Sequence, residues 1–253
     1  MEITWGKDNN SLQIFKAVEK TNTIINIILN QYGLMIMGMD SSKTSLVKLV
    51  LPNSYFDNFR CPTPMEFGIH TASLVSILSK AKNNKTSWKA TSANALSICL
   101  GDDTTQTEFC LRCIDVCEEQ LNIPEIDHDV SFEVSSIILT EILDKMSMAK
   151  SDLKFKIDNR NLKLMADSIE FGKICHIESL ENEDRFQSTI NQTVCLTFGY
   201  NAIQMILCFC KVSKNKCQLA LSSTMPLKLK ITLGTGAFLA IYIAPKMMED
   251  DNE

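Results

Sequence analysis

The chain contains the stretch Phe67-Gly-Ile-His-Thr-Ala-Ser-Leu-Val-Ser-Ile-Leu78, and a second version of it follows 129 positions later as Leu196-Thr-Phe-Gly-Tyr-Asn-Ala-Ile-Gln-Met-Ile-Leu207. In both versions apolar residues recur every three or four positions, a spacing that predicts an amphipathic helix. The apolar positions coincide in the two stretches, because Phe67, Ile69, Leu74, Ile77 and Leu78 correspond to Leu196, Phe198, Ile203, Ile206 and Leu207.

A second set of matches extends this repeat over the rest of each half, at an offset of 128 positions. Chance matching is the alternative in a chain that is 45% hydrophobic, but two nearly equal offsets favour an internal duplication. Each half should then hold a helix, several strands, a second helix and further strands. The matched residues are Ile14, Phe15, Val18, Ile27, Leu29, Leu34 and Ile36, with Ile142, Leu143, Met146, Phe155, Ile157, Leu162 and Leu164 as counterparts.

Alternation of apolar and polar residues predicts half-buried antiparallel strands between four helices. Leu153, Phe155 and Ile157 alternate with polar residues, and the same pattern returns after Pro226. The helices are expected near residues 11–22, 71–82, 135–149 and 199–212.

The two halves are joined by an acidic segment, residues 116–130, which predicts an extended connector because it contains Pro124. We therefore expect an N-terminal domain at residues 1–115 and a C-terminal domain at residues 131–253. Leu121 and Ile123 are unusual in a solvated linker, and they would be exposed unless they pack back on a domain or receive a partner.

The composition argues against a membrane protein, a secreted protein and a strongly basic DNA-binding protein. No stretch reaches the roughly 20 apolar residues that span a bilayer, and the start lacks the apolar core of a signal peptide, so we expect a soluble protein inside the cell. The ten cysteines fall mostly in apolar runs, which suits a reducing compartment. A net charge of −5 and a pI near 5.3 argue against a protein held on DNA by bulk attraction to phosphate.

Four short segments, in this order and spacing, span the whole chain. They are Gly38-Met-Asp-Ser-Ser-Lys-Thr-Ser-Leu-Val47, Phe56-Asp-Asn-Phe-Arg-Cys61, Gln120-Leu-Asn-Ile-Pro-Glu125 and Ile241-Tyr-Ile-Ala-Pro-Lys246. With them the sequence resembles the proliferating cell nuclear antigen family of eukaryotic sliding clamps. Departures from the usual basic positions leave a divergent, viral or unicellular member open.

The resemblance implies an α+β DNA clamp fold, in which two similar domains of antiparallel sheets carry two helices each. Three copies would close head to tail into a ring that encircles duplex DNA, with contact edges near residues 107–116 on one copy and 173–178 on the next. It also implies a non-enzymatic, nuclear processivity factor without cofactors. Its partners would be duplex DNA without sequence preference, a DNA polymerase and other peptide-motif proteins, a clamp loader, and its own copies.

The helices of such a clamp line the hole, so their charge bears on DNA contact. The four helical regions with their C-terminal ends carry a net +6, against −11 for the rest of the chain. Ordinary solvated helix ends are the alternative explanation of these lysines. Residues Ser76, Ser79, Glu141, Asp144, Asn201 and Cys208 stand where the family has basic residues. By resemblance, the DNA-contacting candidates are Lys16, Lys20, Lys80, Lys82, Lys145, Lys150, Lys211 and Lys214.

The resemblance also implies a groove beneath the connector that receives partner peptides through an apolar plug. Core packing is the alternative role of its methionine and leucine members, and the Lys43-Thr44 pair departs from the family's His-Val. Lys163 matches a family lysine that is modified for regulation. The groove candidates are Met39, Lys43, Thr44, Leu46, Leu121, Ile123, Pro124, Pro226, Tyr242, Ile243, Ala244 and Pro245.

Two other classes of protein are alternatives to a clamp. Cys110-x-x-Cys113 with Cys117 lacks a nearby fourth zinc ligand, and neither a catalytic triad nor a nucleotide loop is visible, so the sequence predicts no enzyme and no metal. A clamp-like interaction protein, or one subunit of a heterotrimeric clamp that does not encircle DNA alone, stays open because the basic pattern is reduced.

Overall fold

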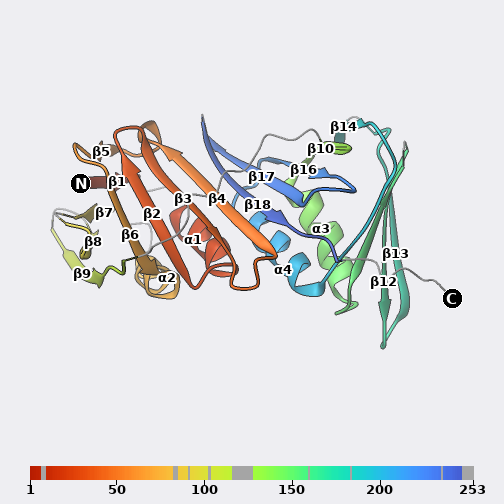
Figure 1. Cartoon of the computed structure of the whole chain (residues 1–253), viewed down its shortest axis with the longest axis horizontal. Helices are drawn as coiled ribbons and strands as arrows, with labels where there is room; N and C mark the ends of the chain where they lie inside the picture. The colour runs from red at the N-terminus through yellow and green to blue at the C-terminus, as the bar shows by residue number, and fades with distance from the viewer. Residues whose placement is uncertain are drawn as a thin grey trace. The chain divides into compact units, whose positions relative to one another are not determined.

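A computed structural model describes residues 1–6, 10–81, 85–90, 92–101, 104–115, 128–158, 160–182, 184–234 and 236–246 of the chain (Figure 1). The chain divides into two compact units, Met1–Ile123 with Thr232–Leu239 and Pro124–Ile231 with Ala240–Glu253. Most of the predicted connector, residues 116–127, lies outside the described residues, so the predicted domain boundaries stay a prediction. No helix in the described part is long and apolar enough to cross a membrane.

The first unit contains two sheets and two helices. One sheet has the strand order β5-β1-β7-β8-β9, and the strands β4-β3-β2-β6 follow one another in another sheet. All pairings between these strands are antiparallel. The elements are β1 (Glu2–Trp5), α1 (Ser11–Glu19), β2 (Ile24–Asn30), β3 (Gly33–Met39), β4 (Ser45–Pro52), the 3-10 turn η1 (Asn53–Tyr55), β5 (Asn58–Arg60), β6 (Met65–His70), α2 (Thr71–Leu78), β7 (Thr86–Lys89), β8 (Ala95–Gly101) and β9 (Gln106–Arg112).

The second unit repeats the order of helices and strands of the first, with the strand orders β14-β10-β16-β17-β18 and β13-β12-β11-β15. The tip of the β17–β18 hairpin, Thr232–Leu239, groups with the first unit. The elements are β10 (Val130–Ser135), α3 (Ser136–Ser147), β11 (Leu153–Ile157), β12 (Asn161–Ser168), β13 (Gly172–Ser179), β14 (Phe186–Ile190), β15 (Val194–Phe198), α4 (Tyr200–Cys210), β16 (Lys216–Leu221), β17 (Leu227–Gly234) and β18 (Ala237–Ile243).

The duplication expected from the sequence is confirmed in the register of the strands. Ile27 lies opposite Ile36 in the first unit, and the residues 128 positions later, Phe155 and Leu164, lie opposite each other in the second. Phe67 pairs with Ile27 as Leu196, 129 positions later, pairs with Phe155. The two offsets differ by one because the second unit has one more residue between β11 and β15 than the first unit has between β2 and β6.

The four predicted helices are confirmed, each ending a few residues earlier than expected. The first ends because Lys20 and Thr21 form turns whose N–H groups donate to the carbonyls of Ala17 and Val18 at 3.2 and 3.0 Å. Thr21 is buried, and its hydroxyl also donates to the Val18 carbonyl. Apolar periodicity continues through such turns because they stay packed on the core, so periodicity overestimates helix length.

An aromatic cluster forms the core beside β1 and β7. Trp5 and Trp88 are fully buried with their ring centroids 5.2 Å apart, and Phe15 of α1 lies 5.7 Å from Trp88. Phe56 meets Trp5 edge to face at 4.9 Å. These contacts hold α1 against the five-stranded sheet of the first unit.

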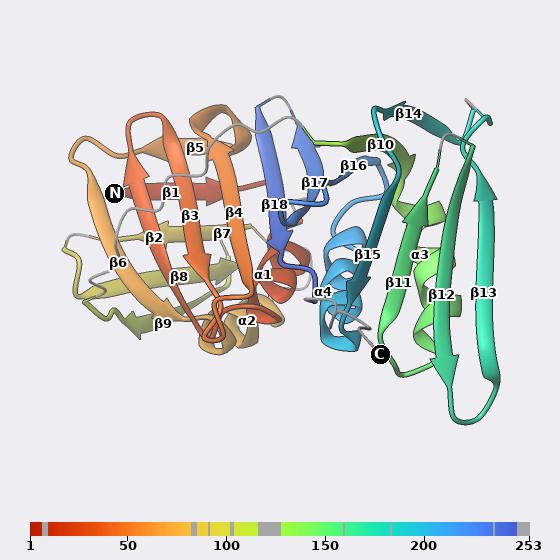
Figure 2. The same cartoon turned by 45° about the vertical axis from the view of Figure 1, so that its right-hand side comes forward.

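The edge strands β9 and β13 have alternating exposed side chains. β9 ends its sheet in the first unit, and β13 ends the four-stranded sheet of the second unit. Figure 2 shows β15, β11, β12 and β13 side by side, with α3 behind them. β9 overlaps the predicted contact edge at residues 107–116, and β13 spans the one at residues 173–178.

Asp129 anchors the start of β10 to the turn before β17. Its carboxylate accepts hydrogen bonds from the backbone N–H of Ser223 at 2.8 Å, from the Gln192 amide and from the hydroxyls of Ser222 and Ser223. These bonds, the Ser223 N–H first, lower the pKa of Asp129 to about 2. The carboxylate is therefore ionised at neutral pH and ties three segments of the second unit together.

Candidate nucleic-acid and partner interfaces

In the first unit, α1 and α2 pack side by side, bury their apolar sides and leave polar sides exposed. Lys16 lies on the exposed side of α1, and Lys20 and Lys80 follow the ends of the two helices. Cations are favoured at helix C-termini because the last carbonyls carry partial negative charge. These three predicted DNA-contacting lysines are thus exposed on one helix pair, whereas Lys82 lies outside the described residues.

In the second unit the exposed side of α3 and α4 is mixed in charge. The Lys211 ammonium lies 3.9 Å from the Asp144 carboxylate, and both side chains are more than half exposed. Lys145 is exposed on α3, and Lys150 follows that helix with a left-handed backbone, φ 53°. An exposed ion pair is weak, but it still neutralises part of the positive charge that Lys211 presents.

A shallow hollow of about 260 Å³ separates the start of α3 from the end of α4. It brings together two of the predicted lysines, Lys211 and Lys214, with one carboxylate, Glu141. Cys210, one of its lining residues, is buried and has a pKa well above the usual thiol range, because it donates a hydrogen bond to Cys217 and is shielded from water. The hollow is lined by Ser136, Ile137, Thr140, Glu141, Cys210, Lys211, Ser213 and Lys214.

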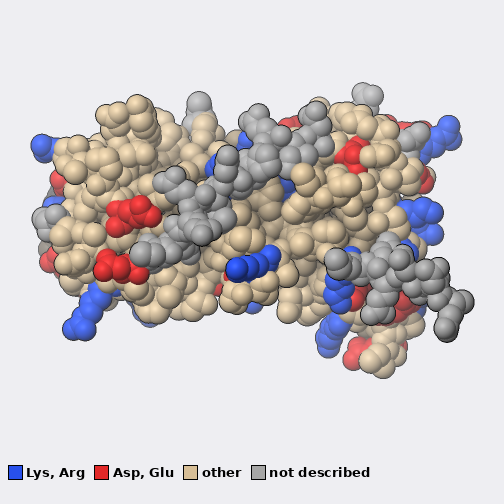
Figure 3. Space-filling view, in the orientation of Figure 1, with Lys and Arg blue, Asp and Glu red and all other residues tan. Residues whose placement is uncertain are grey.

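These helix faces can contact phosphates but offer no group arranged for base recognition. Each lysine ammonium supplies a mobile positive charge, and phosphate contacts carry no sequence information. On the face seen in Figure 3, Lys and Arg side chains form separate small patches among uncharged residues and acidic groups. The chemistry of the described helices therefore fits weak and sequence-independent contact with a nucleic acid backbone.

The groove candidates of the first unit lie on the β3–β4 hairpin. Met39 is 36% exposed and lies opposite Leu46, which is half-buried. The turn between them is held by Asp40, which accepts hydrogen bonds from the backbone N–H groups of Thr44 and Ser45, both at 2.8 Å. Lys43 occupies this turn with φ 56°, so its side chain is presented by a fixed backbone.

The groove candidates of the second unit lie around the end of β18. Tyr242 is half-buried with the Lys228 ammonium 5.9 Å from its ring centroid, and burial raises the pKa of its hydroxyl. Ile243 is 2% exposed, so its side chain belongs to the core and only its backbone can meet a partner. Ala244 and Pro226 are exposed, and Pro245 is half-buried.

The remaining groove candidates, Leu121, Ile123 and Pro124, lie outside the described residues. The groove itself therefore stays a prediction. Of the three cysteines whose spacing does not predict a zinc site, Cys110 is exposed on β9 and Cys113 is half-buried just after that strand, while Cys117 is not among the described residues. Over the ranges that the structure describes, no three His, Cys, Asp or Glu side chains are grouped as metal ligands.

Lys163 lies half-exposed on β12, opposite Lys156 of β11 and Ile177 of β13. The sequence pattern had placed Lys154 and Lys156 only as the polar positions of a strand. Their position beside Lys163 was missed, because alternation shows which face a residue takes but not which residues of other strands lie beside it.

Two family models and several known proteins match this chain. The N-terminal domain model of proliferating cell nuclear antigen matches residues 8–120, and the C-terminal domain model matches residues 122–246. The proliferating cell nuclear antigen of Chaetomium thermophilum is 27% identical over 250 residues, covering 94% of this chain and 95% of that protein. The DNA polymerase sliding clamp of Methanobrevibacter smithii is 26% identical over 242 residues, covering 94% of each. The proliferating cell nuclear antigen of Saccharomyces cerevisiae is 25% identical over 236 residues, covering 90% and 91%.

Proposed function

Because this chain belongs to the proliferating cell nuclear antigen family and is a DNA sliding clamp, we propose that three copies close head to tail around duplex DNA and hold a polymerase on its template. The internal duplication carries this proposal. Two units with one topology and one strand register allow three chains to form a ring of six similar modules.

Ring closure is assigned to β9 of one copy and β13 of the next. Each strand has a strand neighbour on only one side among the described residues, so its other side offers unpaired backbone groups. Pairing the two edges between copies would satisfy these groups and would remove two exposed edges at once. The same contact, repeated with a rotation of one third of a turn, gives a closed ring.

A closed ring is held on DNA by topology and needs only weak contact with the phosphates. The lysines on the helix pairs supply that contact, and screening limits each one to about 8 Å at physiological salt. Polymerase and other peptide-motif partners would bind the predicted groove, with Met39 and Tyr242 as apolar anchors. Ring opening is assigned to a separate loader, and we further propose that the protein acts in the nucleus.

Topological retention tests this function without a loader. A ring that threads onto linear duplex DNA through an open end should stay on it when both ends are then blocked by bulky protein groups. On DNA with one end left open, the ring should leave during the time for which it stays on the blocked DNA. Both samples are held at a salt concentration of about 200 mM, which weakens phosphate contacts. The amount of protein that stays bound to each DNA is measured over time. Equal loss from blocked and open DNA would rule out encirclement.

Substitution of the helix lysines tests how the ring touches DNA. The triple variant Lys16→Ala, Lys80→Ala and Lys211→Ala should bind open duplex about ten-fold more weakly, and its dependence of log affinity on log salt should be shallower by about 1 or more. Asp144→Asn should act in the opposite direction, by about two-fold, because it releases Lys211 from its ion pair. Titrations of labelled duplex over a salt series measure both effects, and unchanged salt dependence in the triple variant would refute the assignment.

The mixed charge of α3 and α4 favours one alternative, a clamp subunit that needs different partner subunits to encircle DNA. The Lys211–Asp144 ion pair and the exposed Glu141 reduce the positive field of the second unit. In that case the isolated chain would fail the blocked-end test, and it would regain retention only when the other subunits are added.

A further inference from the structure

The sheet β13-β12-β11-β15 has a basic outer face. On β11 the side chains of Leu153, Phe155 and Ile157 are buried, so Lys154 and Lys156 point to the opposite face. One row across the sheet consists of Cys195, Lys156, Lys163 and Ile177, and the next consists of Thr197, Lys154, Met165 and Cys175. We call these eight residues the outer face.

The outer face is incomplete as it stands. Lys156 lies directly opposite Lys163, and like charges in facing positions destabilise a strand pair. Ile177 beside them is 60% exposed. Among the described residues, no carboxylate lies within ion-pairing distance of the ammonium groups of Lys154, Lys156 or Lys163. Positive charge without a paired carboxylate and an exposed apolar side chain therefore lie together on this face.

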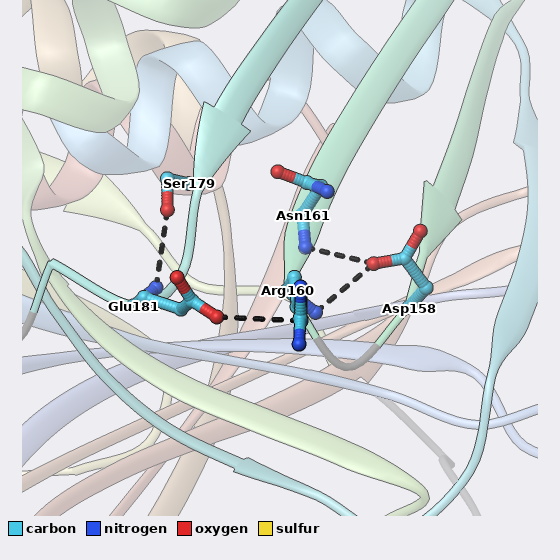
Figure 4. Close-up of polar contacts among 5 residues, drawn as sticks. All are labelled: Asp158, Arg160, Asn161, Ser179 and Glu181. Atoms are coloured by element: carbon cyan, nitrogen blue, oxygen red, sulfur yellow. Dashed lines mark hydrogen bonds and ion pairs between the residues drawn. The ribbon is translucent and has the colours of Figure 1, made fainter.

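The carboxylates at one end of the sheet are engaged elsewhere. Asp158 accepts hydrogen bonds from the backbone N–H groups of Arg160 and Asn161 at 3.0 and 2.8 Å, and Glu181 pairs with Arg160 at 3.5 Å (Figure 4). The bonds from Arg160 and Asn161 lower the pKa of Asp158, and the charge of Lys156 contributes less. At the other end of the sheet, Asp167 lies opposite Lys173. The basic rows are thus bounded by acidic residues at both ends.

The chain itself arrives at the edge of this face. The backbone N–H of Lys246 donates to the carbonyl of Thr197 on β15 at 2.8 Å, and the Lys246 ammonium pairs with Asp152 at 2.5 Å. The sequence then continues as Met247-Met-Glu-Asp-Asp-Asn-Glu253, with four carboxylates and two methionines. Seven residues reach at most about 25 Å, and three strand spacings measure about 15 Å. The segment is long enough to cross from β15 to β13.

We propose that residues 247–253 dock across the outer face, with Met247 and Met248 against Cys195 and Thr197 of β15 and the carboxylates that follow them at Lys154, Lys156 and Lys163. The charges are complementary, and methionine adapts well to irregular apolar surface. Docking shields Lys163 from modifying reagents and enzymes. A nucleic acid fits the face less well, because the two rows contain no aromatic side chain for stacking and acidic residues bound them.

Cross-linking with a carbodiimide tests the contact in the intact protein. The reagent takes up the water that is lost when a carboxylate and a lysine amine join as an amide. Because no atom of the reagent remains in the link, only groups already in contact are joined. Peptide mass spectrometry should find the segment 247–253 joined to Lys154, Lys156 or Lys163, and about 1 M salt should abolish these links. Protein prepared from mixed ¹⁵N-labelled and unlabelled chains should give links within one chain. Links only to other lysines such as Lys214, or only between chains, would overturn the proposal.

A charge-neutral variant gives an independent readout. Replacing the four acids by Glu249→Gln, Asp250→Asn, Asp251→Asn and Glu253→Gln should raise the acetylation rates of Lys156 and Lys163 by about three-fold or more, as expected for several weak ion pairs acting together. The rate at Lys214 should not change. Unchanged acetylation rates at Lys156 and Lys163 in this variant would contradict docking. Docking would also be contradicted if added duplex DNA protects these lysines while the native segment 247–253 does not. The matched control carries Glu19→Gln, Asp57→Asn, Asp115→Asn and Asp184→Asn, four exposed acids elsewhere, and should leave all three rates as they are.

Discussion

Cys110→Pro is expected to reduce the solution mass from about 85 kDa, three times the chain, to the 28.4 kDa of one chain. The Cys113 N–H donates to the Asn94 carbonyl at 2.9 Å, and N–H groups alternate in direction along an antiparallel strand. The N–H of Cys110, three positions away, therefore points to the open edge of β9. Proline removes that donor and blocks the edge without removing a bond to β8.

The association constant between copies should fall by about 100-fold or more, because the proposed ring needs each edge to pair along its length. Light scattering over a dilution series measures the mass, and circular dichroism checks that the single chain keeps its fold. Cys110→Ala is the matched control, since it loses the thiol but keeps the N–H, and it should remain a trimer. A proline variant of unchanged mass would show that β9 is not a contact edge.

Trp88→Ala is expected to destabilise the first unit by about 3–5 kcal/mol. The indole is fully buried between Trp5 and Phe15, at centroid distances of 5.2 and 5.7 Å, so its loss leaves a cavity in the aromatic cluster. The chain has two tryptophans, Trp5 and Trp88, and both belong to the first unit. Fluorescence of the remaining Trp5 during urea unfolding therefore reports on this unit alone.

Trp88→Phe provides the matched control for this cavity. The Trp88 Nε1 is buried and has no hydrogen-bond partner within the described part of the chain, so phenylalanine loses volume but no polar contact. Its cost should stay below about 1.5 kcal/mol. If the alanine and phenylalanine variants unfold at the same urea concentration, packing of the indole does not hold this unit together.

Much of the fold could be predicted from the sequence because its apolar pattern repeats. The strand around Phe155 and the helix around Ile203 each match a counterpart in the other half, and both lie where the pattern placed them. The helix ends could not be predicted, since buried turn residues such as Thr21 continue the apolar pattern after the helical hydrogen bonds stop.

The candidate sites were predictable only in part. The sequence placed Lys16 and Lys80 in helical regions, and the structure has Lys16 exposed on α1 but Lys80 exposed in the turn after α2. The sequence could not show that Asp144 pairs with Lys211, because the two residues lie on different helices and are 67 positions apart. Nor could it show that Ile243 is buried while Ala244 next to it is exposed, because that depends on what packs over the end of β18.

By itself the sequence determined the duplication, the alternation of buried and exposed side chains and the family, because these properties are carried by the order of residues along one strand or helix. The tertiary structure decided which strands lie at the edges and which charges face one another across strands. Lys156, Lys163 and Ile177 form one row only after three strands pair in a particular register. Hydrogen bonds between segments that are distant in the sequence set that register, and they cannot be predicted from the order of neighbouring residues.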